Sequence, residues 1–171
     1  MGCRDTVIVV VAGVSGSGKT TVGAMLAGRL HWEFMDGDSL HPAANIAKMH
    51  AGLPLTDADR RPWLRAIEDW MDQRRAAGAS AVLACSALHR AYREELAAGR
   101  PEVRLVFLRV SREVAAARLA VRHGHFFPAR LLDSQFRDLE PPAPDEPVLV
   151  VDAGRPAAEL VAEIISRLQL A

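Results

Sequence analysis

This chain of 171 residues has little cysteine, few aromatic residues and no net charge. Its two cysteines, Cys3 and Cys85, are too few for a disulfide framework, which favours a reducing, cytoplasmic location. Its 21 basic residues balance 21 acidic ones, so no overall field attracts nucleic acid or an anionic membrane. No apolar run approaches the length of a membrane span. We therefore expect a cytoplasmic protein with no nucleic-acid and no membrane partner.

Lysine is also scarce, because only Lys19 and Lys48 are lysines among the 21 basic residues. A codon bias toward arginine explains the general scarcity. A lysine has a chemical purpose where a flexible point charge must reach a phosphate, since the planar guanidinium does this poorly. Lys48 is therefore a candidate binding residue beside Lys19.

The chain does contain a complete phosphate-binding motif, G-x-x-x-x-G-K-[ST], at residues 13–20. Glycines let the backbone wrap closely around an anion, so that successive N–H groups point at phosphate oxygens. The lysine of the motif reaches the β- and γ-phosphates, and the threonine hydroxyl can ligate Mg²⁺. We expect ATP and Mg²⁺ to bind at Gly13, Val14, Ser15, Gly16, Ser17, Gly18, Lys19, Thr20 and Thr21.

The residues on either side of the motif agree with this function. Residues 6–12 are β-branched and apolar, which predicts a strand buried on both faces, and residues 21–30 predict a helix with one apolar stripe. Further strand segments alternate with helical patterns; they lie at 33–36, 81–85, 105–110 and 148–151. The alternation predicts an α/β fold with a doubly wound parallel sheet, formed by one domain over residues 1–171.

Two helix starts are predicted from capping signals. Asp38 or Ser39 can cap the helix that follows the second strand. Thr56 is a start signal for the next helix, but Pro62 is unfavourable inside a helix. We therefore expect that helix to begin nearer Arg61.

Two carboxylates, Asp36 and Asp38, follow the second predicted strand. Residues two apart in extended backbone face the same side, and ligands of open α/β sheets bind at the carboxyl ends of the strands. Asp38 is the candidate to orient a substrate hydroxyl and accept its proton. Asp36, with Thr20, is the candidate to hold Mg²⁺ or one of its waters. A plain Asx turn is the alternative explanation for either acid alone.

Arg118, Arg122 and His125 are spaced i, i+4, i+7, which places them on one stripe if the helix there continues to about residue 123. Phosphoryl transfer runs largely on positioned positive charge. We expect a mobile lid over about 118–138 that brings the two arginines to the transferring phosphate and His125 to the substrate. A solvated arginine face is the alternative.

Phosphate loops of this kind serve GTPases, motor ATPases and small-molecule kinases. The guanine-reading Asn-Lys-x-Asp of GTPases is absent from a suitable place in the sequence. The apolar strand that ends in Asp152 is the last one, so we interpret Asp152 as a loop-capping or nucleotide-edge residue and not as the metal ligand of a motor ATPase. The acid pair after the second strand favours a small-molecule kinase.

Longer strings carry a resemblance to a known family. Residues 36–42 read D-G-D-S-L-H-P and residues 59–64 read D-R-R-P-W-L. Further matching strings lie at 45–49, 52–58, 85–88, 92–93, 124–127, 134–136 and 139–140. With these strings, which cover nearly the whole chain in order, the sequence resembles the gluconokinases. The resemblance implies a shikimate-kinase-like P-loop kinase fold with a five-stranded parallel sheet and a lid. It also implies the conversion of ATP and D-gluconate to ADP and 6-phospho-D-gluconate, and a homodimer.

A gluconate site has to combine a cation for the carboxylate with groups that bind hydroxyls. Beside Asp38 and His125, the resemblance and this chemistry together select His41, Lys48, Arg60, Ser86 and Arg90. The chain departs from the family pattern at His89, where many relatives have lysine, and at Leu53, where glutamate is common. His89 puts a basic contact after Ser86 in doubt.

Two alternatives remain open from the sequence. One is a P-loop kinase of another small hydroxy acid or sugar acid, such as a shikimate-like acceptor. The other is a non-catalytic nucleotide-binding module. The intact Lys19, Thr20, Asp36 and Asp38 argue against this second alternative, because a lapsed enzyme has no chemical need for all four.

Overall fold

The centre of the fold is strand β1 (Ile8–Ala12), whose five apolar residues are all buried. In the computed structural model, which describes residues 5–122 and 129–170, this strand lies in a five-stranded sheet of order β2-β3-β1-β4-β5. Every neighbouring pair is parallel. The other strands are β2 (Glu33–Asp36), β3 (Ala81–Ala84), β4 (Val103–Arg109) and β5 (Val148–Asp152). The predicted α/β fold with a five-stranded parallel sheet is confirmed.

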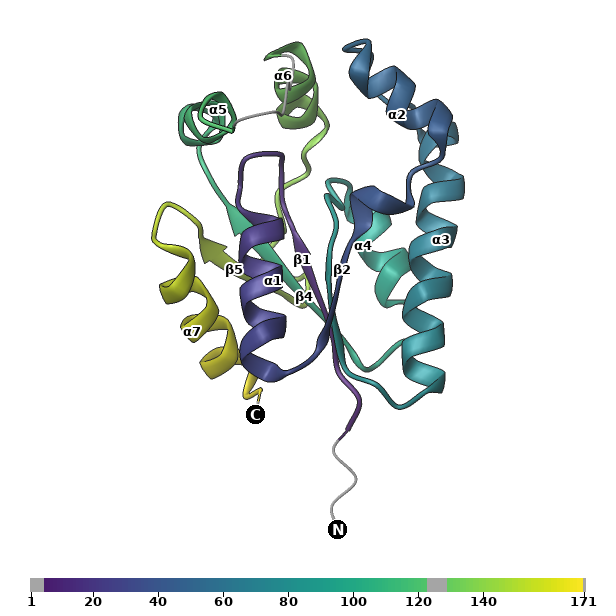
Figure 1. The fold of residues 1–171 in the computed structure, drawn as a ribbon, viewed down its shortest axis with the longest axis vertical. Helices are drawn as coiled ribbons and strands as arrows, with labels where there is room; N and C mark the ends of the chain where they lie inside the picture. Colours follow the sequence, from purple (N-terminus) through teal and green to yellow (C-terminus); the bar gives the residue numbers. More distant parts are fainter. Residues whose placement is uncertain (1–4, 123–128, 171) are drawn as a thin grey trace.

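Helices cover both faces of the sheet, because alternate residues of each strand point to opposite faces. Ile8 and Val10 pack in the core with α3 (Asp57–Ala76) and α4 (Arg90–Ala97). Val9 and Val11 pack with α1 (Lys19–Leu30) and α7 (Ala157–Leu168) on the other face. Figure 1 shows α1 and α7 on one side of the sheet and α3 and α4 on the other. No helix among the described residues is long and apolar enough to cross a membrane.

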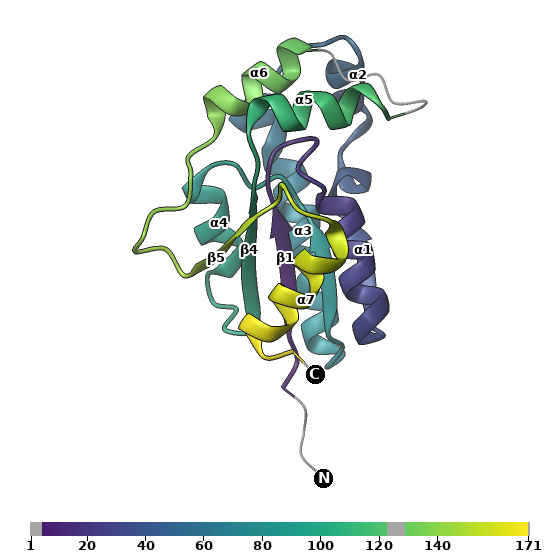
Figure 2. The same ribbon diagram turned by 90° about the vertical axis from the view of Figure 1, so that its left-hand side faces the viewer.

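The remaining helices gather at the carboxyl ends of the strands. They are the 3₁₀ helix η1 (Gly37–Leu40) and helices α2 (Ala43–His50), α5 (Arg112–Ala120) and α6 (Ala129–Asp138). Helices α2, α5 and α6 lie together beyond this edge of the sheet in both views (Figures 1 and 2). This is the edge at which open α/β sheets bind their ligands.

Helix α2 begins after Pro42 and has no side-chain cap, so the predicted cap by Asp38 or Ser39 is wrong. Those two residues lie in η1, where Asp36 Oδ1 accepts a hydrogen bond of 3.0 Å from the Asp38 N–H. The fixed φ of proline suits the start of a helix, and Pro42, with a φ of −59°, directly precedes α2.

Helix α3 begins at Asp57, so the predicted start near Arg61 is wrong as well. Thr56 and Asp59 form a capping box, in which each side chain accepts the backbone N–H of the other. The first turn is therefore held by two reciprocal hydrogen bonds. Pro62 is tolerated inside the helix.

Candidate active site

The phosphate loop joins β1 to α1, and α1 begins at Lys19, two residues earlier than predicted. Gly16 has a φ of 80°, and a Cβ on it would lie 2.5 Å from the carbonyl oxygen of Ala115. Only glycine therefore allows the loop to pass this closely under α5. The free N–H groups at the start of α1 point into the same loop, which makes it a site for anions.

Lys19 lies at the start of α1, with its ammonium group donating a hydrogen bond of 3.0 Å to the Val14 carbonyl oxygen. Desolvation lowers the pKa of Lys19 below its ordinary value, while the Asp38 and Asp36 carboxylates oppose the shift. A phosphate oxygen can take the place of the carbonyl as the acceptor of this hydrogen bond, and its negative charge makes the bond stronger.

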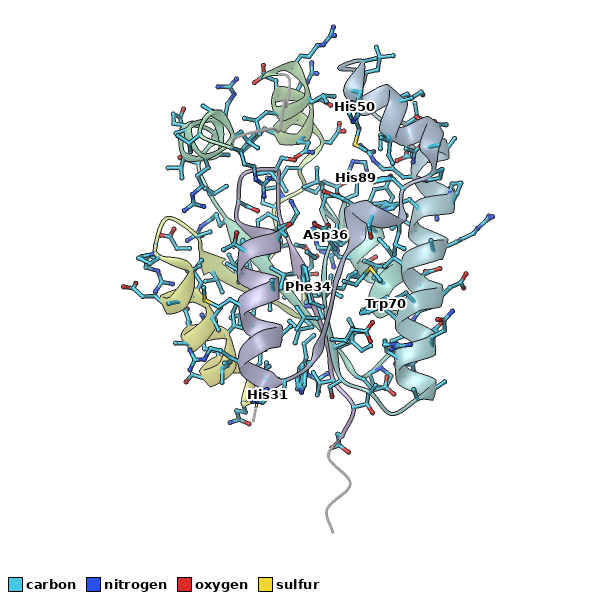
Figure 3. All side chains as sticks on the ribbon, viewed as in Figure 1. His31, Phe34, Asp36, His50, Trp70 and His89 are labelled. Carbon is cyan, nitrogen blue, oxygen red and sulfur yellow. The ribbon has the colours of Figure 1, made fainter. Side chains whose placement is uncertain are left out.

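Asp36 and Thr20 come together from β2 and α1. The Thr20 hydroxyl donates a hydrogen bond of 3.1 Å to Asp36 Oδ2. The other carboxylate oxygen accepts the Asp38 N–H, so Asp36 also makes the local turn that was the alternative explanation for it. Figure 3 labels Asp36 at the carboxyl end of β2, beside the start of α1. These are hard oxygen donors of the kind that Mg²⁺ takes, so they fit that ion.

A first hollow lies on the substrate side of the phosphate loop. It brings together six of the residues predicted for the site, which are Ser15, Lys19, Asp38, His41, Arg60 and Ser86. Gly37 makes the arrangement possible, because a Cβ on it would lie 2.5 Å from the carbonyl oxygen of Ala84. The turn that carries Asp38 can therefore rest directly on β3.

His41 stacks on the indole of Trp63, with ring centroids 4.5 Å apart and planes within 9°. Desolvation lowers the pKa of His41, so its imidazole is neutral at neutral pH and can donate to or accept from a hydroxyl. Trp63 is 1% exposed, and its indole N–H donates to the Gly37 carbonyl oxygen over 2.8 Å. Trp63 therefore belongs to the core and forms part of the wall of this hollow.

Arg60 is the second cation of this hollow, beside Lys19. Its guanidinium lies 3.2 Å from Asp138 and 3.7 Å from Asp57, and it stands 5.9 Å from the centre of the Tyr92 ring. Only 14% of the side chain is exposed. These neighbours fix the planar fork in a position where it can bind a carboxylate through two hydrogen bonds.

Lys48 and Arg90 lie outside the lining of the hollow. Lys48 donates to Asp59 over 2.7 Å, and this hydrogen bond lowers the pKa of Asp59 to about 2. Arg90 is paired with Glu94 and Asp145 on the surface. The structure thus gives both cations partners within the protein, and their substrate-binding roles stay predictions.

Arg118 and Arg122 do not share a helix, because α5 ends at Ala120 instead of continuing to about residue 123. The Arg122 N–H bonds the Leu119 carbonyl oxygen in a tighter turn there. Arg118 donates to the carbonyl oxygens of Ser17 and Ala153 over 3.2 and 2.6 Å. Arg122 is exposed. His125 and part of the predicted lid lie outside the described residues.

A second hollow lies on the other side of the phosphate loop. Its lining includes residues from the loop, from α5 and from the start of α7, among them Gly18, Thr21, Arg118, Arg122 and Pro156. A third hollow between the two contains Thr20, Asp36, Asp38 and Arg122. The arrangement offers room for a nucleotide on one side, an acceptor on the other, and charged groups where the two meet.

Sequence reasoning missed Gln135 as a site residue. Its side-chain oxygen accepts the Ser15 N–H over 2.7 Å, so α6 contacts the phosphate loop directly. Tyr92, which lines the same hollow as Gln135, was missed as well. Both lie in strings that carry the family resemblance (134–136 and 92–93), which was the available signal.

A phosphate loop on a parallel sheet, an acid pair at the next strand and a separate acceptor hollow define a P-loop kinase that acts on a small molecule. The chain is 48% identical to the gluconokinase of Gluconobacter oxydans strain 621H over 169 residues, 99% of this chain and 94% of that protein. It therefore belongs to the gluconokinase family.

Other comparisons agree. The thermoresistant gluconokinase of Escherichia coli strain K12 is 43% identical over 163 residues, 95% of this chain and 93% of that protein. A solved gluconokinase structure from Sinorhizobium meliloti 1021 is 44% identical with a TM-score of 0.85, and the match covers 97% of this chain and 93% of that one. A family model described as an AAA domain matches residues 8–142.

Proposed function

We propose that this enzyme transfers the γ-phosphoryl group of ATP to the C6 hydroxyl of D-gluconate, giving 6-phospho-D-gluconate and ADP. The observation that carries the proposal is the first hollow, which combines Lys19 of the phosphate loop, Asp38 and the fixed guanidinium of Arg60. A phosphate contact, a proton acceptor and a carboxylate-binding cation are the groups that this reaction requires.

In this mechanism Arg60 binds the gluconate carboxylate, and His41 and Ser86 bind hydroxyls along the sugar-acid chain. Asp38 orients the C6 hydroxyl and accepts its proton as the oxygen attacks phosphorus. Lys19 stabilises the charge that develops on the γ-phosphoryl oxygens. Thr20 and Asp36 would hold Mg²⁺, which neutralises phosphate charge when it is bound. The homodimer and the cytoplasmic location remain predictions from the sequence.

A panel of acceptors tests the substrate. With ATP and Mg²⁺, we expect ADP release to be fastest with D-gluconate, and much slower with shikimate, with other sugar acids and without an acceptor. Equal or faster turnover of another hydroxy acid would favour the shikimate-like alternative. Tight ATP binding with no turnover on any acceptor would favour the non-catalytic nucleotide-binding module.

We also propose that Arg122 acts on the transferring phosphate as part of the lid. Arg122→Ala is expected to slow turnover ~30–1000-fold, the effect of losing one preorganised donor. Thermal stability should barely change, because the side chain is exposed. Steady-state kinetics and thermal melting measure both quantities.

Arg137→Ala is the matched control, since Arg137 is an exposed arginine of α6 that lines none of the three hollows. It should leave turnover unchanged. Amide hydrogen exchange in α5 and α6 should slow when ATP and gluconate are both present. If the exchange rates in α5 and α6 are the same with and without the ligands, and Arg122→Ala keeps full activity, these helices do not form a mobile lid. They are then a fixed pair with a solvated arginine face.

A further inference from the structure

Arg93, near the start of α4, is a charged side chain that the reaction described above does not use. Its side chain is 1% exposed and that of its partner Glu146 is 3% exposed. The guanidinium N–H groups donate to Glu146 through two hydrogen bonds of 2.9 and 3.1 Å, and to three carbonyl oxygens, those of Ala87, Leu88 and Glu140. All five donors of this arginine are therefore satisfied inside the protein.

Two of the three carbonyl groups, those of Ala87 and Leu88, belong to the turn that lines the first hollow. Ser86 and Leu88 line the hollow, and Ala87 between them is buried with a φ of 41°. This left-handed conformation is unfavourable for a residue with a Cβ and needs support from its surroundings. Arg93 stabilises this conformation by donating hydrogen bonds to the carbonyl oxygens of Ala87 and Leu88.

The same guanidinium connects this turn to the end of α6. The Glu140 carbonyl oxygen accepts from Arg93 over 2.9 Å, and the Glu140 N–H donates to the Leu88 carbonyl oxygen over 2.9 Å. Helix α6 contributes Gln135 to the hollow just before this point. One buried side chain therefore fixes the distance between the 86–88 turn and the end of α6, which are far apart in the sequence.

We propose that Arg93 is a positioning residue for the acceptor: it sets the geometry of the 86–88 turn and of the end of α6, and through them the affinity for gluconate. The inference rests on the proposed function for the identity of the acceptor. We expect the effect on the acceptor and not on ATP, because the second hollow contains none of the residues that Arg93 contacts.

A purely structural role is the competing explanation, and Arg100 provides a matched control for it. Arg100 follows the other end of α4, is 12% exposed and pairs with Asp72. It also donates to backbone carbonyl oxygens, including those of Glu95 and Leu96. It differs from Arg93 in that its partners lie away from the hollow.

The experiment compares gluconate KM and ATP KM in Arg93→Met and Arg100→Met, at a temperature well below both melting points. We expect Arg93→Met to raise the gluconate KM roughly tenfold or more and to change the ATP KM less than about twofold. Arg100→Met should lower the melting temperature and leave both KM values unchanged. Arg93→Lys keeps the charge but has fewer hydrogen-bond donors. Its gluconate KM should lie between those of Arg93→Met and the wild type.

Arg93→Met leaves Glu146 buried and unpaired, which can prevent folding. The double variant Arg93→Met/Glu146→Met removes that penalty, since an apolar pair can replace a buried ion pair with little loss of stability. The gluconate KM should stay raised in this stable protein. A gluconate KM within about twofold of the wild type, or an equal rise in both KM values, would overturn the positioning role.

A readout without substrate separates this inference from the proposed function. The Glu140 amide, bonded to the Leu88 carbonyl oxygen, should exchange its hydrogen faster in the double variant, while the Val103 amide, bonded to the Arg100 carbonyl oxygen, should not. If the wild type fails to phosphorylate gluconate but this exchange pattern holds, the acceptor is wrong and the positioning role stands. If gluconate is phosphorylated and Glu140 exchange is unchanged, the positioning role is wrong.

Discussion

Lys19→Ala is expected to leave a folded protein that has lost nearly all turnover. Its ammonium group is the cation of the phosphate loop, and its pKa is lowered by desolvation in a site already shaped for an anion. Loss of a cation that stabilises the transferring phosphoryl group costs about 10³–10⁵-fold in rate. The loss should appear mainly in kcat, because the charge on the γ-phosphoryl oxygens is best matched in the transition state.

Arg29→Ala is the control for this prediction, since Arg29 is an exposed basic residue in the last turn of the same helix. Its removal should leave kcat unchanged. Circular dichroism melting should give similar transitions for both variants and the wild type. A Lys19→Ala protein that keeps most of its activity would show that this loop is not the catalytic ATP site.

The second large effect is expected for Asp38→Asn. The carboxylate lies at the junction of the acceptor hollow and the hollow that contains Thr20 and Asp36. The amide has nearly the same shape but cannot accept a proton, so kcat should fall about 10²–10⁴-fold, the usual contribution of a general base. ATP binding, measured by calorimetry, should change little.

Asp36→Asn is the matched comparison, because it makes the same chemical change two residues earlier. Asp36 accepts the Thr20 hydroxyl, and we assign it to Mg²⁺, so this variant should need more Mg²⁺ and recover when Mg²⁺ is raised. Asp38→Asn should not recover. If added Mg²⁺ rescues Asp38→Asn and not Asp36→Asn, the two roles are assigned the wrong way round.

Features that depend on neighbours in the sequence were predicted well. The phosphate loop is one run of eight residues between a β-branched strand and a helix, and the structure places it there. Asp36 and Asp38 lie after β2 as predicted, because the carboxyl ends of parallel strands meet at one edge of the sheet. Helix ends were predicted less well, since the capping box at Thr56 opposed the signal of Pro62.

Partners of long side chains could not be predicted from the sequence. Lys48 was selected for its rarity, yet it pairs with Asp59, which lies in a different helix. Gln135 reaches Ser15 across 120 positions, and no local pattern records that contact. A flexible side chain has many acceptors within its reach, and the packing of distant elements decides which one it meets.

The sequence by itself therefore determined the α/β class, the place of the phosphate loop and the acids that follow the second strand. These features arise from backbone preferences and burial patterns that extend over a few residues. Only the tertiary structure decided that Lys19 and Arg60 line the first hollow while Lys48 and Arg90 do not, and it alone brought Arg93 into contact with the turn that lines this hollow. The first hollow is built from the phosphate loop, the start of α1, η1, α2, α3, the turn after β3, α4 and α6. Its geometry therefore exists only once the fold has brought those segments together.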